Sequence, residues 1–221
     1  MRELHWFHPE QQSWLTKGPN RWSGWSATDA SAAQLEGEWK PWEAVMDSSE
    51  APHVRWFCGA KTNAAFNELD RHVLAGHGAE TAFIAEAENG AQSRISRRQL
   101  LLQSVLAAHA LRESLGVGTC QLVAFCLPNG LDAVVWIEAA KRLAVPYVAI
   151  AGGTSSSSLA QRLADTGAAV LVVSSGLLAA AEAAVATLSE PPALVLLGGT
   201  AEKPQPGCHD GEALLAAAQV E

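Results

Sequence analysis

The sequence predicts an α/β protein: a partial doubly wound parallel sheet with flanking helices, preceded by an irregular Trp-rich extension. Between residues 121 and 197, short apolar runs alternate with segments of helical periodicity, which is the pattern of βαβ units. Gly, Pro or Asn closes several of these runs. Residues 1–55 show no sustained period. We therefore expect two parts, an irregular extension over residues 1–55 and an α/β domain over 56–221.

The extension is expected to lie over the larger domain. Aromatic side chains that are spread irregularly serve most simply as anchors in grooves. An aromatic platform for a sugar or a nucleotide is the alternative, but it favours regular spacing. Seven of the eight tryptophans lie in or beside this segment, at positions 6, 14, 22, 25, 39, 42 and 56.

A helix is expected to begin at Lys61, because apolar residues recur there at spacings of three and four until Gly76 and Gly78. His72 and His77 are about 140° apart on such a helix. They therefore diverge, and we expect no metal site here. The apolar positions are Ala64, Ala65, Leu69, Val73 and Leu74.

A hairpin and a long helix are expected next. Thr81–Glu86 and Arg94–Ser96 are the predicted strands, joined at an Asn89-Gly90 turn. The serine that ends the second strand and Gln99 have the spacing of a capping box, so a helix is expected to begin between them. Gly116 is expected to end it.

Residues 121–153 predict strand, helix, strand and a glycine turn. Leu122–Leu127 is apolar and ends at Pro128. The helix that follows is amphipathic. Its polar side is predicted to hold Asp132, Glu138, Lys141 and Arg142. Gly152 and Gly153 come after the next strand, at the carboxyl end where doubly wound proteins bind ligands.

The remaining elements follow the same alternation. Residues 156–165 and 177–188 are expected to be helices, and residues 169–173 and 193–197 strands. The composition of residues 198–211 predicts a loop. A weak helix over residues 212–219 is expected last.

The segment from Gly152 to Ser158 allows two interpretations. Backbone amides at a helix start, with the positive end of the helix dipole behind them, stabilise an anion or a phosphate. A serine N-cap after a glycine turn needs no ligand at all. Both interpretations place the same residues at the sheet edge.

Charge and composition exclude several classes of protein. The net charge is −8, made up of −4 for residues 1–50, +1 for 51–150 and −5 for 151–221, so nucleic acid is not an expected partner. No apolar tract is long enough to span a membrane, and no secretory signal begins the chain. The cysteines show no CxxC spacing, so we expect reduced thiols and a cytoplasmic location.

Catalytic motifs are absent from the sequence. It contains no GxGxxG, GxxxxGK[ST] or GxSxG motif. Glu68 and Asp70 are two residues apart on the predicted helix and do not face each other as an acid and base pair. We therefore assign no catalytic residue and no metal ligand.

A family resemblance rests on residues 56–73, WFCGAKTNAAFNELDRHV. This segment resembles the amino-terminal signature of the AMP-forming acyl-CoA synthetases of the acetyl-CoA synthetase type. Residues 67–78 and 138–143 look closest to the ligase part of propionyl-CoA synthases. The resemblance covers about residues 1–200.

The resemblance implies an activity for a complete enzyme. Such enzymes activate a short carboxylate with ATP and Mg²⁺ to an acyl-adenylate and then transfer the acyl group to coenzyme A. The ATP motifs and the catalytic lysine would lie beyond Glu221. The resemblance therefore implies an amino-terminal fragment that is inactive alone.

The part of the family site that the chain retains is on the coenzyme A side. Gly152 and Gly153 match the family's glycine pair, which approaches the CoA nucleotide. Thr154 follows them where the family has an aromatic residue. The family's arginines for the CoA phosphate are replaced around Leu178 and Ala181.

Two hypotheses remain at this point. The chain is either part of a short-chain acyl-CoA synthetase, or a non-catalytic binding or interaction module that kept the fold and lost the chemistry. A truncated sheet leaves an unpaired edge and an uncovered apolar face, so self-association is expected.

Overall fold

The structure is a computed structural model that describes residues 40–87, 89–118, 120–199 and 207–218. The expected anchoring of Trp6, Trp14, Trp22, Trp25 and Trp39 lies outside these residues. The boundary expected between residues 55 and 56 stays a prediction.

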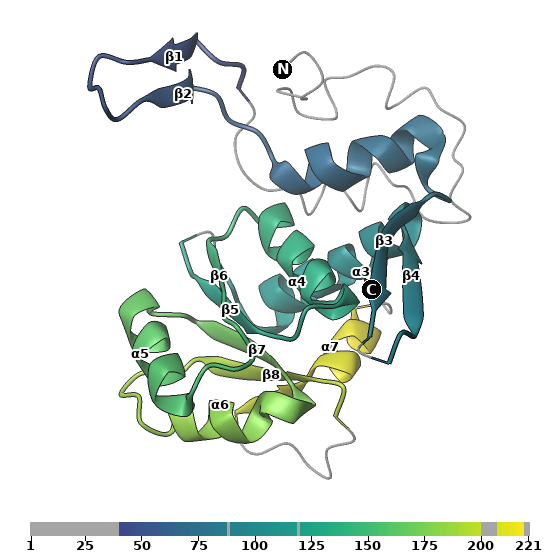
Figure 1. The fold of residues 1–221 in the computed structure, drawn as a ribbon, viewed down its shortest axis with the longest axis vertical. Coiled ribbons are helices and arrows are strands. Elements are labelled where there is room, and N and C mark those ends of the chain that lie inside the picture. Colours follow the sequence, from purple (N-terminus) through teal and green to yellow (C-terminus); the bar gives the residue numbers. More distant parts are fainter. Residues whose placement is uncertain (1–39, 88, 119, 200–206, 219–221) are drawn as a thin grey trace.

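A parallel sheet of five strands organises the described chain (Figure 1). Its spatial order is β6-β5-β7-β8-β9, and every neighbouring pair is parallel. The chain therefore adds strands first on one side of β5 and then on the other, which is doubly wound topology. The predicted fold class is confirmed. The strands are β5 (Val123–Cys126), β6 (Tyr147–Ala149), β7 (Val170–Ser174), β8 (Ala193–Leu197) and β9 (Cys208–Asp210).

Helices cover both faces of this sheet. Alternate side chains of a strand point to opposite faces, so Val123 and Phe125 of β5 pack into one apolar core and Ala124 and Cys126 into the other. The first core holds α3 (Arg97–His109), α4 (Leu131–Arg142) and α7 (Gly211–Ala217). The second holds α5 (Ser156–Thr166) and α6 (Leu178–Val185), which follows a short 3₁₀ turn at Ser175–Leu177. The expectation of an uncovered apolar sheet face is wrong, because both faces are packed.

Strand β9 corrects the prediction of a loop over residues 198–211. Cys208, His209 and Asp210 are only half-buried and too polar to be recognised as a strand. They pair with Leu194, Val195 and Leu196 of β8. Their conformation is set by this pairing, which local composition does not encode.

The helix expected from Lys61 is present over residues 64–77, with wide π-type turns at Phe66–Asp70 and Val73–His77. Gly76, at φ 100°, interrupts the helical conformation where the sequence predicts the end of the helix. Strands β3 (Thr81–Glu86) and β4 (Gln92–Ser96) form the predicted hairpin. The capping box is confirmed, since Ser96 and Gln99 exchange side-chain to backbone hydrogen bonds at the start of α3. A further wide turn, Ala110–Ser114, extends α3.

The end of the extension is more regular than expected. Strands β1 (Ala44–Asp47) and β2 (Arg55–Cys58) form an antiparallel hairpin. Trp42 packs edge-on against Phe57, with ring centroids 6.3 Å apart. Trp56 is 61% exposed, so the prediction that it anchors in a groove is wrong. Its ring instead lies against Phe57 of the same strand, with ring centroids 6.5 Å apart.

Candidate functional site

The glycine turn lies at the carboxyl end of β6, where the sequence places it. Thr154 N donates to Ala151 O at 3.0 Å and closes the turn. A Cβ at Gly152 would lie 3.1 Å from Leu177 Cδ1, which is a tight contact. Gly152 therefore allows the loop after β6 to pack against the loop after β7.

Gly153 differs from Gly152, because no contact within the described protein requires a glycine at position 153. It is exposed, its backbone is not in the left-handed region, and an added Cβ would meet no atom within 4 Å. Thr154, next to it, is half-buried. The three predicted residues thus form one turn, in which only Gly153 offers free space to an incoming group.

The first turn of α5 has the serine cap that the sequence allowed. Ser155 Oγ accepts a hydrogen bond from Ser158 N at 3.3 Å. This bond occupies one of the amides that an anion at the helix start would use. The serine N-cap interpretation is confirmed, and an anion is not needed to explain the local geometry.

The sequence on either side of the turn carries little positive charge. Arg162 is the only cation between residues 143 and 199, and it lies exposed in the second half of α5. Leu178 is half-buried, and Ala181 is fully buried against the sheet. An arginine at position 181 would have to displace this core contact.

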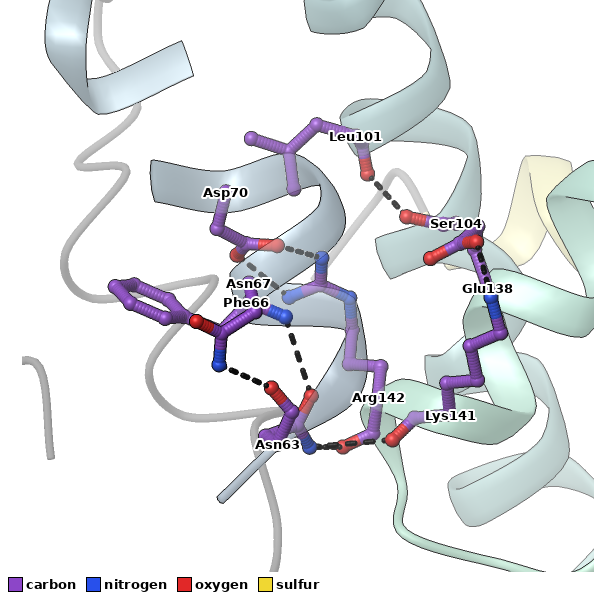
Figure 2. A network of polar contacts seen from close by, with 9 residues as sticks. All are labelled: Asn63, Phe66, Asn67, Asp70, Leu101, Ser104, Glu138, Lys141 and Arg142. Carbon is purple, nitrogen blue, oxygen red and sulfur yellow. Dashed lines mark hydrogen bonds and ion pairs between the residues drawn. The ribbon is translucent and has the colours of Figure 1, made fainter. Parts of the chain in front are cut away.

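A second polar cluster joins the helix over residues 64–77 to the last turn of α4 (Figure 2). Arg142 donates to Asp70 through two bonds, Nη1 to Oδ1 at 2.9 Å and Nη2 to Oδ2 at 2.6 Å. Both side chains are 0% exposed. The prediction that Arg142 lies on a solvated side of α4 is therefore wrong, because the helix over residues 64–77 covers that side of α4.

Asn63 caps the carboxyl end of α4. Its Nδ2 donates to Lys141 O at 3.1 Å and to Arg142 O at 2.9 Å, and its Oδ1 accepts from Phe66 N at 3.2 Å. Asn67 supports it by donating to Asn63 O at 3.0 Å. The last carbonyls of a helix lack hydrogen-bond donors within the helix. The Asn63 side chain donates to two of them.

Lys141 lies between two carboxylates. Its Nζ contacts Glu68 Oε2 at 2.5 Å and Glu138 Oε1 at 2.8 Å. Glu138 is also buried, contrary to the predicted solvated side. Burial raises its pKa, Lys141 opposes this rise and Glu68 adds to it. Burial also works against the charge of Lys141, but the two carboxylates outweigh it and raise the pKa of Lys141.

The sequence contained a signal for this cluster. Asn63, Asn67 and Asp70 follow the same spacing of three and four as the apolar residues of their helix. Polar residues on a buried face need partners, so charged residues on another buried helix could have been expected. The identity of that helix required the tertiary structure.

Neither cluster is arranged for acid and base catalysis or for a metal. The charged side chains of the second cluster are bound to one another, and the glycine turn offers neutral backbone groups. No three His, Cys, Asp or Glu side chains converge within the described ranges. No helix in the described part of the chain has the length and apolar composition to cross a bilayer.

Comparisons with known proteins match almost the whole described chain. A family model for the acetyl-coenzyme A synthetase N-terminus matches residues 30–67. A model for AMP-binding enzymes matches residues 70–215. The solved acyl-CoA synthetase of Brucella canis superposes on 95% of this chain and 32% of its own, with a TM-score of 0.64 and 19% identity. This last likeness concerns the fold.

Curated relatives agree with the family models. Acetyl-coenzyme A synthetase of Burkholderia lata is 37% identical over 133 residues, which are 60% of this chain and 20% of the relative. The enzyme of Burkholderia mallei (strain SAVP1) is 38% identical over 136 residues, 61% of this chain and 20% of the relative. The chain thus matches about a fifth of the length of these relatives. Since the AMP-binding model covers well over half of its residues, the chain belongs to the family of AMP-binding enzymes.

Proposed function

We propose that this chain forms part of the coenzyme A side of a short-chain acyl-CoA synthetase and does not form acyl-CoA alone. The complete enzyme would join a small carboxylate to CoA, with ATP and Mg²⁺ consumed in forming an acyl-adenylate. One observation carries the proposal. In an AMP-binding enzyme, Gly153 stands exposed at the carboxyl edge of the sheet with open space around it.

The role proposed for this chain is to bind and orient CoA. Without a Cβ, Gly153 lets a nucleotide approach the backbone closely. Thr154 offers a hydroxyl but no aromatic face on which a base could stack. We assign no residue of this chain to ATP, to Mg²⁺ or to the transfer of a proton.

Affinity for CoA is expected to be low. Phosphate groups are bound most strongly by arginine and lysine, and Arg162 is the only cation between residues 143 and 199. Binding must rely on neutral contacts at the turn. The scarcity of cations favours the second candidate function, a non-catalytic module that kept the fold and lost the ligand.

Calorimetry with CoA separates these two functions. The test variant is Gly153→Val, because an added Cβ at Gly153 meets no atom within 4 Å. The control is Gly118→Val, before β5 at the opposite edge of the sheet, where an added Cβ meets only Gln121 Oε1 at 3.7 Å. Heat that Gly153→Val abolishes and Gly118→Val preserves supports the CoA site. Absence of heat for the parent chain supports the non-catalytic module.

An activity assay tests the second half of the proposal. The purified chain is mixed with ATP, Mg²⁺, CoA and acetate, propionate or 3-hydroxypropionate. No acyl-CoA is expected. Product formation above the level of a heat-denatured sample would contradict the proposed inactivity of the chain.

A further inference from the structure

Two carboxylates from different helices meet one ammonium group where the helix over residues 64–77 contacts α4. Lys141 Nζ lies 2.5 Å from Glu68 Oε2, on the first helix, and 2.8 Å from Glu138 Oε1, on its own helix. Figure 2 marks the bond between Lys141 and Glu138. We call this arrangement the Glu68–Lys141–Glu138 bridge. With all three groups ionised, its two carboxylates and one ammonium leave a net charge of −1.

The two carboxylates of the bridge differ in their contact with water. The Glu68 side chain is 52% exposed, whereas that of Glu138 is 7% exposed. The second oxygen of Glu138, Oε2, is buried and accepts no hydrogen bond from any residue that the structure describes. Because a buried oxygen without a donor costs more free energy in a charged carboxylate than in a neutral carboxyl group, this site favours a proton on Glu138.

The nearest helices bring no further charge to Glu138. Asp70 and Arg142 lie beside the bridge and bind each other through two hydrogen bonds. The strands β3 and β5 and the helix α3 also pack against α4. The side chains of α3 in the shared core are apolar, and the buried hydroxyl of Ser104 donates to Leu101 O within α3. The buried face of α3 therefore leaves the charge of the bridge unchanged.

The two strands that pack on α4 give the same result for the described residues. All four side chains of β5 are uncharged. In β3 the charged residue is Glu86, which is exposed and accepts a bond from Gln92. Lys141 and Glu68 are the charged side chains that act on Glu138. Burial and these two neighbours therefore determine whether Glu138 holds a proton.

We propose that the Glu68–Lys141–Glu138 bridge is a proton-dependent contact, which holds the helix over residues 64–77 on α4 more firmly as the pH falls. A proton from solvent binds the carboxylate of Glu138, and the bridge changes from a net charge of −1 to neutral. Lys141 keeps its ammonium group and its contact with Glu68. When the helix leaves α4, Glu138 enters water and loses the neighbouring carboxylate of Glu68. The docked form therefore binds this proton more tightly than the open form.

The directions of the pKa shifts agree with this geometry. Burial raises the pKa of Glu138 above its ordinary value of 4.5, Lys141 opposes the rise, and Glu68 adds to it. Burial works against the charge of Lys141, but the two carboxylates outweigh it and raise the pKa of Lys141 above 10.5, so Lys141 stays charged while Glu138 titrates. The contribution of Glu138 to docking is complete below pH 4.5 and is lost as the pH rises through its folded-state pKa.

Carbon nuclear magnetic resonance of the Glu138 carboxyl group, recorded on the full chain across a pH series, tests the role of Glu68. Glu68→Gln should lower the titration midpoint of Glu138, because it removes the second carboxylate from Lys141. Glu68 is half exposed, so the variant should keep the fold. Glu113→Gln makes the same chemical change at an exposed position outside the bridge and should leave the midpoint of Glu138 unchanged. Equal midpoints for Glu138 in the parent chain and in Glu68→Gln would overturn the proposal.

Amide hydrogen exchange measures the docking of the helix itself. After correction for the intrinsic exchange rate, the opening constant of the Phe66–Asp70 amides should rise between about pH 5 and pH 7, by at most about tenfold per pH unit, which is the limit for one proton. The amides of α6, on the other face of the sheet, serve as the reference. Glu138→Gln should remove this dependence on pH. An opening constant that stays level or falls as the pH rises in the parent chain would overturn the proposal, whatever the outcome at the CoA site.

Discussion

Arg142 and Asp70, 72 residues apart in sequence, form a bidentate ion pair with both side chains fully buried. The pair joins the helix over residues 64–77 to the end of α4. Asn63 adds bonds to the same helix end. Asp70 and Arg142 both lie in the segment matched by the AMP-binding model, and Asn63 lies in the segment matched by the N-terminus model. The bonds of Asn63 therefore join the two segments at this point.

Asp70→Leu is expected to destabilise the chain by about 3–5 kcal/mol, because it leaves the buried charge of Arg142 without a partner. Urea unfolding measures the loss. The control is the double variant Asp70→Leu with Arg142→Met, which removes both charges and keeps an apolar contact. It is expected to be more stable than Asp70→Leu alone. The single variant Arg142→Met is measured as well. If the double variant loses as much free energy of unfolding as Asp70→Leu and Arg142→Met together, this account of the pair is contradicted.

Glu138→Gln is expected to change how stability depends on pH. Burial raises the pKa of Glu138 above its ordinary value of 4.5, so the folded state binds this proton more tightly than the unfolded state. The resulting stabilisation is complete below pH 4.5 and is lost as the pH rises through the folded-state pKa. The stability of Glu138→Gln relative to the parent should therefore increase from acid towards neutral pH.

Urea midpoints measured across this pH range check the sign for Glu138. The exposed Glu113 provides a matched control, because Glu113→Gln makes the same chemical change outside the cluster. The effect of Glu138→Gln is therefore judged as its difference from the effect of Glu113→Gln at each pH. A relative stability of Glu138→Gln that falls as pH rises would show that the contact with Lys141 outweighs burial.

Local pattern predicts most of the fold for identifiable reasons. Val123–Cys126 and Ala193–Leu197 are continuous apolar runs of strand length, and Ser96 with Gln99 is a complete capping signal, so each is readable without a partner. Cys208–Asp210 is a strand only because β8 lies beside it. The pairing of Met46 with Trp56 likewise depends on the register between two short strands.

The candidate sites show the same division. The glycine turn after β6 was placed correctly because a strand end and a helix start enclose it. The amphipathic pattern of α4, taken alone, predicts that Arg142 and Glu138 lie on its solvated side. Both residues are buried by the helix over residues 64–77, about seventy residues earlier in the chain. The sequence of α4 alone contains no pattern that predicts this contact.

The four cysteines are free, as the sequence predicts, and should differ in reactivity. Burial raises the pKa of Cys126, and burial with Glu182 and Asp210 raises that of Cys208. The thiolate is the reactive form, so iodoacetamide should modify the exposed Cys120 before either. Peptide mass spectrometry gives the order. In urea the differences should disappear, and equal rates for Cys120 and Cys126 in the native chain would contradict the structure.

Gly211→Ala is expected to destabilise the junction of β9 and α7 by about 1–3 kcal/mol through overpacking. The added Cβ would lie 2.3 Å from Leu197 Cδ2 and 2.9 Å from Leu196 O, which is backbone. Gly176→Ala is the control, since no atom lies within 4 Å of its added Cβ. Urea unfolding should separate the two variants clearly. Similar midpoints would mean that α7 does not pack as closely on β8 as described.

Nuclear magnetic resonance with CoA tests the central claim most directly, because it reports on individual backbone amides at the sheet edge. On titration with CoA, the amide signals of Gly153 and Thr154 should shift and saturate, while that of Gly118 stays constant. Gly153→Val should remove the shift of Thr154. Unchanged signals at the glycine turn, at CoA concentrations that saturate any other site on the chain, would contradict the proposed coenzyme A site.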